Sequence, residues 1–343
     1  MVEITPEIKA QLEEAKKQCP FCKIIKGEIP ADKVYSDDKI HGILDINPWV
    51  NGHVLLMPKE HYPILPYVQP DDFKHLFGKL PKFVKAINKA MLSTGANVVI
   101  ANGAVAGQQS PHFLVHVLPR ESGDKLNLYA FDKKKEIDES KLKQAIHILS
   151  QNIPIMLNKH FAKNPAEWRK QNFSNTIHIY EDEKIICTLP LNPQCLGHLE
   201  IKLKQDISFE ELDEETSTHL FQVASFCASA IFEGIGAQGT NIILKTGHSN
   251  DNDGKTSLHI IPRMQDDGLD LVGKPMSSKP ENKRIASKIA DETYIVNLKE
   301  EKRLETIEIQ HKPEVITVKA EKENKKIMTA KDEIAAAIEA ASR

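Results

Sequence analysis

The sequence of 343 residues lacks several features that would assign it to common functional classes. It has no run of roughly 20 apolar residues, which is the length needed to cross a bilayer. Its N-terminus, MVEITPEIKAQLEEAKKQ, lacks the apolar stretch of a signal peptide. A formal net charge of -3 gives no overall attraction to a membrane or to nucleic acid. We therefore expect no membrane partner, and the overall charge does not support a nucleic-acid partner.

The sequence also lacks the even set of cysteines that a disulfide-stapled protein uses. Its five cysteines lie at positions 19, 22, 187, 195 and 227, an odd count with one close pair. A reducing compartment is the simplest interpretation, so we expect the protein to be cytoplasmic. With 41% hydrophobic and 27% charged residues, the composition is that of a globular protein long enough for two domains.

What the sequence does contain is an internal repeat. The segment VYSDDKIHGILDINPWVNGH (34–53) returns as IYEDEKIICTLPLNPQCLGH (179–198), and HVLPR (116–120) returns as HIIPR (259–263). Between them, GANVVIANG (95–103) returns as GTNIILKTG (239–247). The matches keep their order and are displaced by about 144 residues. This agreement predicts a duplicated domain rather than convergent patterning.

Each copy has the same predicted elements. In the first copy, apolar segments predict strands that end near residues 46, 58, 101 and 119. Apolar side chains at helical spacing predict a helix over 71–92, with a kink or a break at Pro81. One helix laid on an antiparallel sheet makes each copy an α+β unit.

The pair Cys19 and Cys22 forms a CxxC motif at the start of the first copy. Such a motif serves redox chemistry or binds a metal. Redox use favours the N-terminus of a helix in a thioredoxin-like unit, which the surrounding sequence does not show. A tetrahedral zinc site needs two more ligands. His61 and His112, each beside a predicted strand, are the candidates.

Several motifs of the first copy together resemble the histidine-triad (HIT) superfamily of nucleotide hydrolases and transferases. The motifs are CPFCKIIKGEIPADKVY, LDINP…GHVLLMPKEH and NG…AGQQSPHFLVHVLPR, and they cover nearly all of residues 17–122 in the family's order. In zinc-bearing members, the ligands are the CxxC pair, the histidine after the Pro-Lys motif and the first triad histidine. The resemblance therefore implies a structural Zn²⁺ ion held by Cys19, Cys22, His61 and His112.

The position of the family's nucleophile is altered. In the family, the triad reads His-x-His-x-His, and the middle histidine attacks the α-phosphate to form a nucleotidyl-histidine intermediate. Here the segment reads HFLVH (112–116), so Leu114 stands at the nucleophile's position. An isobutyl side chain has no lone pair for attack or proton transfer. His53 and His116 remain as the catalytic candidates, since the family places these histidines around the phosphate.

The residues that match the family's nucleotide contacts are present more completely than the residues of the triad. Asp45 matches the aspartate that contacts the ribose, and Ile29 and Leu44 are candidate walls of a base pocket. Taken alone, Asp45 could equally be a turn residue at a strand end. The resemblance implies a purine nucleotide, or a small molecule that contains one, as the ligand. The loop that contacts sugar and phosphate is matched by Asn102, Gly107, Gln108 and Gln109, together with His116.

The second copy departs further from the family pattern. No CxxC motif precedes it, and Asp206 and Lys255 stand near the other two ligand positions, so we expect no zinc there. Pro190 replaces the ribose aspartate, and Ser257 stands at the nucleophile's position. His259 shares a strand face with Ser257, but no orienting acid is identifiable. We expect this copy to support the first.

The sequence thus predicts an α+β protein of two tandem HIT-like units, each an antiparallel sheet with a packed helix, that form an intramolecular pseudo-dimer. We expect a monomer of this kind or a higher homo-oligomer. The predicted divisions are an N-terminal helix (1–16), a zinc-bearing unit (17–125), a helical connector (126–172), a degenerate unit (173–275) and a charged C-terminal extension (276–343).

Three functional hypotheses remain open at this point. The leading one is a nucleotide-binding protein whose catalysis is impaired by Leu114. The second is a HIT-type hydrolase or nucleotidyltransferase that uses another residue, such as His53 or His116. The third is a non-catalytic scaffold that binds protein or RNA through the C-terminal extension.

Overall fold

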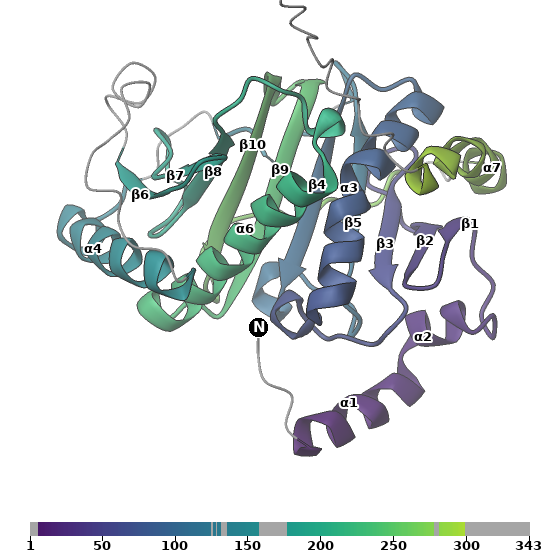
Figure 1. Ribbon diagram of the computed structural model, residues 1–343, viewed down its shortest axis with the longest axis horizontal. Coiled ribbons are helices and arrows are strands. Elements are labelled where there is room, and N and C mark those ends of the chain that lie inside the picture. Colours follow the sequence, from purple (N-terminus) through teal and green to yellow (C-terminus); the bar gives the residue numbers. More distant parts are fainter. Residues whose placement is uncertain are drawn as a thin grey trace, which may run out of the picture. The chain divides into compact units, whose positions relative to one another are not determined.

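The computed structural model describes residues 6–124, 126–127, 129–131, 136–157, 177–277 and 281–298. Residues 158–172 of the predicted connector and the extension beyond Leu298 therefore lie outside the described residues. The described residues form a ten-stranded antiparallel sheet with helices packed on it (Figure 1). The predicted α+β class is confirmed at this level.

The sheet runs in the order β1-β2-β3-β5-β4-β9-β10-β8-β7-β6. Its two halves meet where β4 pairs with β9, from Gly95 opposite Gly247 to Asn102 opposite Thr240. The strand order therefore reads in the same way from either edge toward this seam. The first half contributes β1 (Lys33–Ser36), β2 (Ile40–Leu44), β3 (Val54–Pro58), β4 (Gly95–Asn102) and β5 (Val115–Arg120). The second half contributes β6 (His178–Glu181), β7 (Ile185–Thr188), β8 (Leu199–Leu203), β9 (Gly239–Ser249) and β10 (Asn252–Arg263).

Alternating side chains along the strands give the sheet two different faces. On β5, Val115 and Val117 belong to the main hydrophobic core, so His116 between them points to the opposite face. The core face is covered by α3 (Pro70–Met91) and α6 (Glu214–Ile235), which pack against each other across the seam (Figure 1). The functional side chains of both halves therefore lie on the face away from these helices.

Helix α3 continues through Pro81, so of the two predicted alternatives, a kink or a break, the break is wrong. A proline has no N–H to donate to the carbonyl four residues earlier, which here belongs to Phe77. Ser217 of α6 supplies the missing donor, because its buried Oγ donates to the carbonyl oxygen of Phe77 at 2.6 Å. The neighbouring helix thus stabilises α3 at a position where the local sequence favours a break.

Two further helices cover the outer parts of the core face. Helix α4 (Glu139–Met156), from the predicted connector, packs against α6 and β6 of the second half. Helix α7 (Asn282–Glu292), from the predicted extension, packs against α3, β1 and β2 of the first half. Each helix thus follows one half in the sequence and packs on the other (Figure 1).

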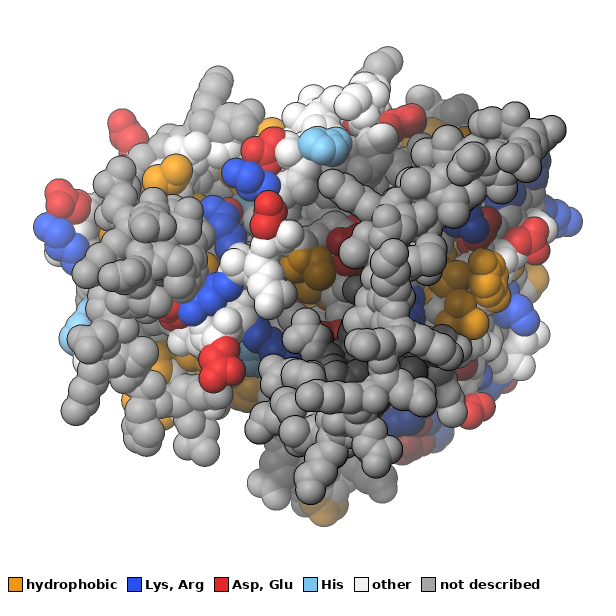
Figure 2. All heavy atoms as spheres, turned by 45° about the horizontal axis from the view of Figure 1, so that its top comes forward, with side chains coloured by type: hydrophobic (Ala, Val, Ile, Leu, Met, Phe, Trp, Pro, Cys, Tyr) orange, Lys and Arg blue, Asp and Glu red, His pale blue; other side chains and the backbone are white. Residues whose placement is uncertain are grey.

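The remaining elements are short or lie at the N-terminal end. Among the described ranges, no helix is both long and apolar enough to span a membrane. On the face seen in Figure 2, the described acidic and basic side chains are interspersed, in line with the small net charge. The remaining elements are the N-terminal helices α1 (Pro6–Gln18) and α2 (Pro20–Ile25). The others are the short 3-10 helices η1 (Leu65–Tyr67), η2 (Ala104–Ala106), η3 (Phe209–Glu211) and η4 (Thr293–Asn297).

Candidate functional site

The four side chains predicted as metal ligands converge in the first half. Cys19 and Cys22 lie at the start of α2, His61 lies in the loop after β3, and His112 precedes β5. One candidate ligand atom from each lies within 4.8 Å of the others, and all four residues are buried. The Sγ atom of Cys22 is 3.4 Å from Nδ1 of His61 and 3.6 Å from Nδ1 of His112. These residues could together hold a metal ion.

Local contacts orient this cluster toward metal binding. Nε2 of His112 lies 2.9 Å from the carbonyl oxygen of Pro58, which can only accept, so Nε2 carries the hydrogen. Nδ1 therefore keeps its lone pair and faces the thiols, with Sγ of Cys19 at 3.7 Å. Burial and the neighbouring Cys19 raise the pKa of Cys22 to about 12. Redox chemistry and metal binding both need the thiolate, so it is the convergence of two histidine rings on the thiols that favours metal binding over redox chemistry.

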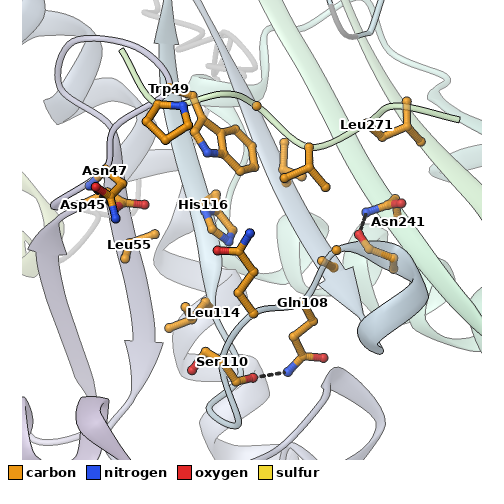
Figure 3. A pocket seen from close by; sticks show the side chains of 18 of the residues that line it. Asp45, Asn47, Trp49, Leu55, Gln108, Ser110, Leu114, His116, Asn241 and Leu271 are labelled. Carbon is orange, nitrogen blue, oxygen red and sulfur yellow. Dashed lines mark hydrogen bonds between the residues drawn. The ribbon is translucent and has the colours of Figure 1, made fainter. Parts of the chain in front are cut away.

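A cavity of about 290 Å³ adjoins the cluster on the face of the sheet opposite α3 (Figure 3). His112 belongs both to the cluster and to the cavity wall. Leu114 also lines the cavity, and so does His116. The second half contributes five residues to the wall: Asn241, Leu271, Val272, Gly273 and Pro275.

A chain of hydrogen bonds fixes the protons on two histidines of this site. The backbone N–H of Trp49 donates to Nδ1 of His53 at 3.3 Å, so this nitrogen accepts. Burial lowers the pKa of His53 and lowers that of His116 to about 4, so both rings are neutral near pH 7. Nε2 of His53 consequently donates to Nδ1 of His116 at 3.0 Å. His116 then carries its hydrogen on Nε2, which makes that atom a donor.

Asp45 stands beside this hydrogen-bond chain at the rim of the cavity. Its Oδ1 accepts from the backbone N–H of Asn47 at 2.8 Å, and its Oδ2 lies 3.5 Å from Nδ1 of His53. Burial raises the pKa of Asp45. Figure 3 shows Asp45 and Asn47 together on one side of the cavity, away from Leu271.

The indole ring of Trp49 covers one side of His116. The two rings are stacked, with centroids 5.1 Å apart and planes inclined by 12° (Figure 3). A segment from the second half, which we call the strap (residues 271–275), packs on the indole. A Cβ atom added at Gly273 of the strap would lie 2.2 Å from Cδ2 of Trp49, so this approach requires glycine. The second half therefore helps to fix the shape of the first-half cavity.

The predicted nucleotide-contacting residues are divided by the structure. Those that line the cavity are Asp45, Gly107, Gln108, Gln109 and His116. The side chain of Gln108 is engaged within its own loop, because it accepts from the N–H of Gly103 and donates to two carbonyl groups. Gln109 is exposed at the surface of this loop. The loop therefore meets the cavity mainly through its backbone and Gln109.

Three predicted contact residues do not line the cavity. Ile29 is exposed after α2, and Leu44 is buried in the core that faces the helices. Asn102 is buried: its Oδ1 accepts from the backbone N–H of Leu65 at 3.1 Å, and its Nδ2 donates to Oγ1 of Thr240 at 3.2 Å. Asn102 thus joins the two halves at the seam instead of facing the cavity.

The sequence analysis missed the residues that form the apolar wall. Phe21, Ile46 and Leu55 line the cavity, and Ile46 is 73% exposed. Phe21 and Ile46 lie inside the CPFC and DINP motifs, so their place beside the predicted ligands was a usable indication. The strap offered no such indication, because its contact with Trp49 depends on how the two halves pair.

The second half contains a corresponding hydrogen-bond chain. The backbone N–H of Gln194 donates to Nδ1 of His198 at 3.1 Å, and Nε2 of His198 lies 3.1 Å from Nδ1 of His259. Nε2 of His259 lies 3.2 Å from Oγ of Ser257. The structure also brings in an acid that the sequence did not identify, because Oε1 of Glu200 lies 3.9 Å from Nε2 of His259. This distance is too long for a hydrogen bond.

Comparison with known proteins identifies the family. The model of the HIT domain matches residues 26–123, which lie in the first half. An uncharacterized HIT-like protein of Methanocaldococcus jannaschii is 40% identical over 120 residues, which cover 35% of this chain and 92% of that protein. This chain belongs to the HIT family.

Other HIT relatives have names that state an activity. An adenylylsulfatase of Arabidopsis thaliana is 42% identical over 116 residues, which cover 34% of this chain and 59% of that protein. An adenosine 5′-monophosphoramidase of Saccharomyces cerevisiae is 37% identical over 124 residues, which cover 36% of this chain and 75% of that protein. Among solved structures, a zinc-bound histidine triad family protein of Mycobacterium smegmatis is similar over 32% of this chain and 81% of its own, with 35% identity and a TM-score of 0.31.

Proposed function

We propose that the first half binds a purine nucleoside monophosphate, or the same part of a larger nucleotide-containing molecule, and that its catalysis is impaired. The observation that carries this proposal is the cavity wall, in which Leu114 takes the nucleophile's position near a histidine that donates. Phe21 and Ile46 offer an apolar surface to a base, and Asp45 offers oxygens to ribose hydroxyls. The relatives named adenylylsulfatase and adenosine 5′-monophosphoramidase support an adenine nucleotide.

The directions of the hydrogen bonds support impaired catalysis. Attack on phosphorus needs a lone pair directed at the substrate. Nδ1 of His53 and Nδ1 of His116 both accept hydrogen bonds inside the protein, and Nδ1 of His112 faces the cysteines. The Nε2–H group of His116 is suited instead to donate to a phosphate oxygen, which makes a charge-assisted hydrogen bond. The site is therefore arranged to hold a nucleotide rather than to attack it.

We also propose that the Cys₂His₂ cluster is a structural zinc site. Bond lengths of about 2.3 Å to sulfur and 2.0–2.1 Å to nitrogen place tetrahedral zinc ligands roughly 3.4–3.8 Å apart. The sulfur–nitrogen distances of 3.4, 3.6 and 3.7 Å fit that requirement. When bound, zinc would cross-link α2, the loop after β3 and the segment before β5. None of the five cysteines, all of which lie in the described ranges, forms a disulfide, which supports a reducing, cytoplasmic compartment.

The two halves are, in our proposal, tandem HIT-like units that pair as a pseudo-dimer within one chain. The strand order from each edge to the seam supports this pairing. Matching side-chain contacts also support it, since Arg120 bonds to Asn97 on the neighbouring strand as Arg263 bonds to Asn241. A closed pairing of this kind needs no second chain to complete the sheet, which supports a monomer.

The packing of the helices favours units that are longer than the predicted ones. The predicted units are 17–125 and 173–275, with α4 assigned to a connector and α7 to an extension. Because α4 packs on the second half and α7 on the first, we propose that each unit ends in a helix exchanged with the other. The two exchanged helices add packing contacts between the halves of the pseudo-dimer.

Two assays on the full chain separate the three hypotheses. Calorimetry with AMP should show saturable binding at the first half, and adenosine 5′-phosphoramidate should release AMP no faster than it does in buffer. Turnover that is lost in His53→Phe and His116→Phe variants would instead establish the hydrolase hypothesis. An absence of any AMP heat, together with no thermal protection by AMP, would favour the scaffold.

A further inference from the structure

The second half has a cavity of its own, of about 640 Å³, beside Ser257 and His259. Its lining differs in chemistry from that of the first. On β3 of the first half, Leu55 lies opposite His116, whereas on β8 the charged Glu200 lies opposite His259. Charged side chains on a sheet face are costly to bury unless they have partners or a task. This cavity has therefore diverged toward polar recognition rather than merely lost its original residues.

A row of three side chains crosses the floor of this cavity. Ser257 of β10 lies directly opposite Lys202 of β8 and directly opposite Lys245 of β9. The three point away from the helices, since Leu258 and Leu244 next to them belong to the main core. Ser257 and Lys245 are each 7% exposed. With strands about 4.8 Å apart, the side chains of the two lysines start on either side of Ser257.

The hydrogen-bond chain makes the Ser257 hydroxyl a donor toward the cavity. Nδ1 of His198 accepts from the backbone N–H of Gln194, so Nε2 of His198 donates to Nδ1 of His259. Nε2 of His259 then donates to Oγ of Ser257, and the hydroxyl hydrogen is left to point elsewhere. Burial lowers the pKa of His198 to about 3 and also lowers that of His259, which keeps both rings neutral. His259 cannot act as a base on Ser257 in this arrangement, so the pair is not a nucleophile with its base.

The acidic side chains of this cavity have cationic partners. Oε2 of Glu200 lies 3.0 Å from Nζ of Lys202, and Oδ1 of Asp251 lies 3.2 Å from Nη1 of Arg120. Asp253 is exposed at the rim. Nζ of Lys245 donates to the neutral carbonyl group of Tyr129 at 3.0 Å. Both lysines thus have partners inside the protein, and each ammonium group carries three hydrogens, so it can also donate to a negative group placed over Ser257.

We propose that the second half binds the phosphoryl group of a small phosphate monoester over Ser257, between Lys202 and Lys245. The hydroxyl and the two ammonium groups supply donors to the phosphoryl oxygens. Leu191 and Phe131 also line the cavity and offer an apolar surface to the organic part. The position of Asp45 is taken here by a proline, so the carboxylate available to ribose in the first half is absent, and an ester without a ribose is favoured.

Calorimetric titration of the full chain with glycerol 3-phosphate and with inorganic phosphate tests this proposal. Ser257→Ala and Lys202→Gln should each weaken binding of the ester by about 10-fold or more, because each removes a donor to a charged group. Lys82→Gln is the charge-matched control: Lys82 lies on α3 and pairs with Glu214 at 3.1 Å, on the helical side of the sheet. This control should bind the ester as the wild type does.

A further variant shows which cavity the ligand occupies. His116→Phe alters the first half only and should leave ester binding unchanged. The proposal is overturned if the ester shows no saturable binding, if Lys82→Gln weakens it as much as Lys202→Gln does, or if His116→Phe abolishes it. Tighter binding of the ester than of inorganic phosphate supports the contact with the organic part, and binding of inorganic phosphate alone would contradict it. Because AMP binding at the first half is measured separately, failure here leaves the nucleotide proposal standing.

Discussion

Replacing His116 by phenylalanine removes one hydrogen-bond donor and keeps an aromatic ring for Trp49 to stack on. Nδ1 of His116 is occupied by His53, so the donor that the variant loses is Nε2, which we assign to the phosphate. A hydrogen bond to a charged group contributes about 1.5–3 kcal/mol. The Kd for AMP should therefore rise by about 10- to 150-fold. The buried Nε2–H of His53 also loses its acceptor, which should lower the free energy of unfolding by about 1–3 kcal/mol.

Calorimetric titration of AMP near neutral pH measures this change, and circular dichroism verifies that the variant is folded at the temperature used. His259→Phe is the matched control, because it removes the corresponding ring of the second half and leaves His198 without its acceptor in the same way. It should lose similar stability and keep the wild-type Kd for AMP. A folded His116→Phe protein that binds AMP as tightly as the wild type would refute the assignment of His116 as the phosphate donor.

Three further predictions concern the metal, the core and the buried histidines. Metal analysis should find about one zinc per chain, and a Cys19→Ser/Cys22→Ser variant should lose it; a stable wild type without metal would contradict this. Ser217→Ala should lower the free energy of unfolding by about 1–3 kcal/mol, because it leaves a buried carbonyl without a donor; Ser229→Ala removes only an added hydrogen bond within α6 and should cost less than about 0.5 kcal/mol in the same denaturant titration. Equal losses in the two serine variants would contradict the proline-rescue interpretation. Burial lowers the pKa of His198 to about 3, so the unfolded chain binds a proton that the folded chain does not between about pH 6.5 and pH 3. The stability from this residue is complete above that range and is lost as the pH falls through it; an NMR titration in which His198 gains its proton near pH 6.5 would contradict the buried arrangement.

Local patterns predicted the strands and the main helix of each copy and offered the metal-cluster residues as candidates, and the resemblance to the HIT family implied the full ligand set. The spacing of Cys19 and Cys22, with a histidine beside each of two strands, is short-range information, and the structure brings all four side chains together. The helical spacing of apolar residues predicted α3 correctly, but it did not predict that the helix continues through Pro81. The intact helix depends on Ser217, which lies far away in the sequence and contacts α3 only after the two halves pair.

Contacts in the folded chain also explain why two of the predicted contact residues do not line the cavity. Asn102 stands at the start of a family loop in the sequence, but Thr240 of the second half offers a partner that holds it in the interior. Leu44 alternates onto the helix-covered face of β2, and the next apolar residue, Ile46, lines the cavity in its place. A two-residue step within a strand would keep the side chain on the same face, so Ile46 reaches the cavity because it lies in the bend beyond the end of β2. The strap on Trp49 likewise required the packing of two distant segments, which no local motif encodes.

Incubation of wild type and Leu114→His with adenosine 5′-phosphoramidate, followed by AMP release and intact mass, tests the central claim most directly. The claim is that the first half binds the nucleotide but lacks the attacking atom. The wild type should bind AMP, release it from the phosphoramidate no faster than buffer does and show no adenylyl adduct, whereas Leu114→His should gain turnover. Release of AMP by the wild type, with an adenylyl group on His53 or His116, would contradict the account.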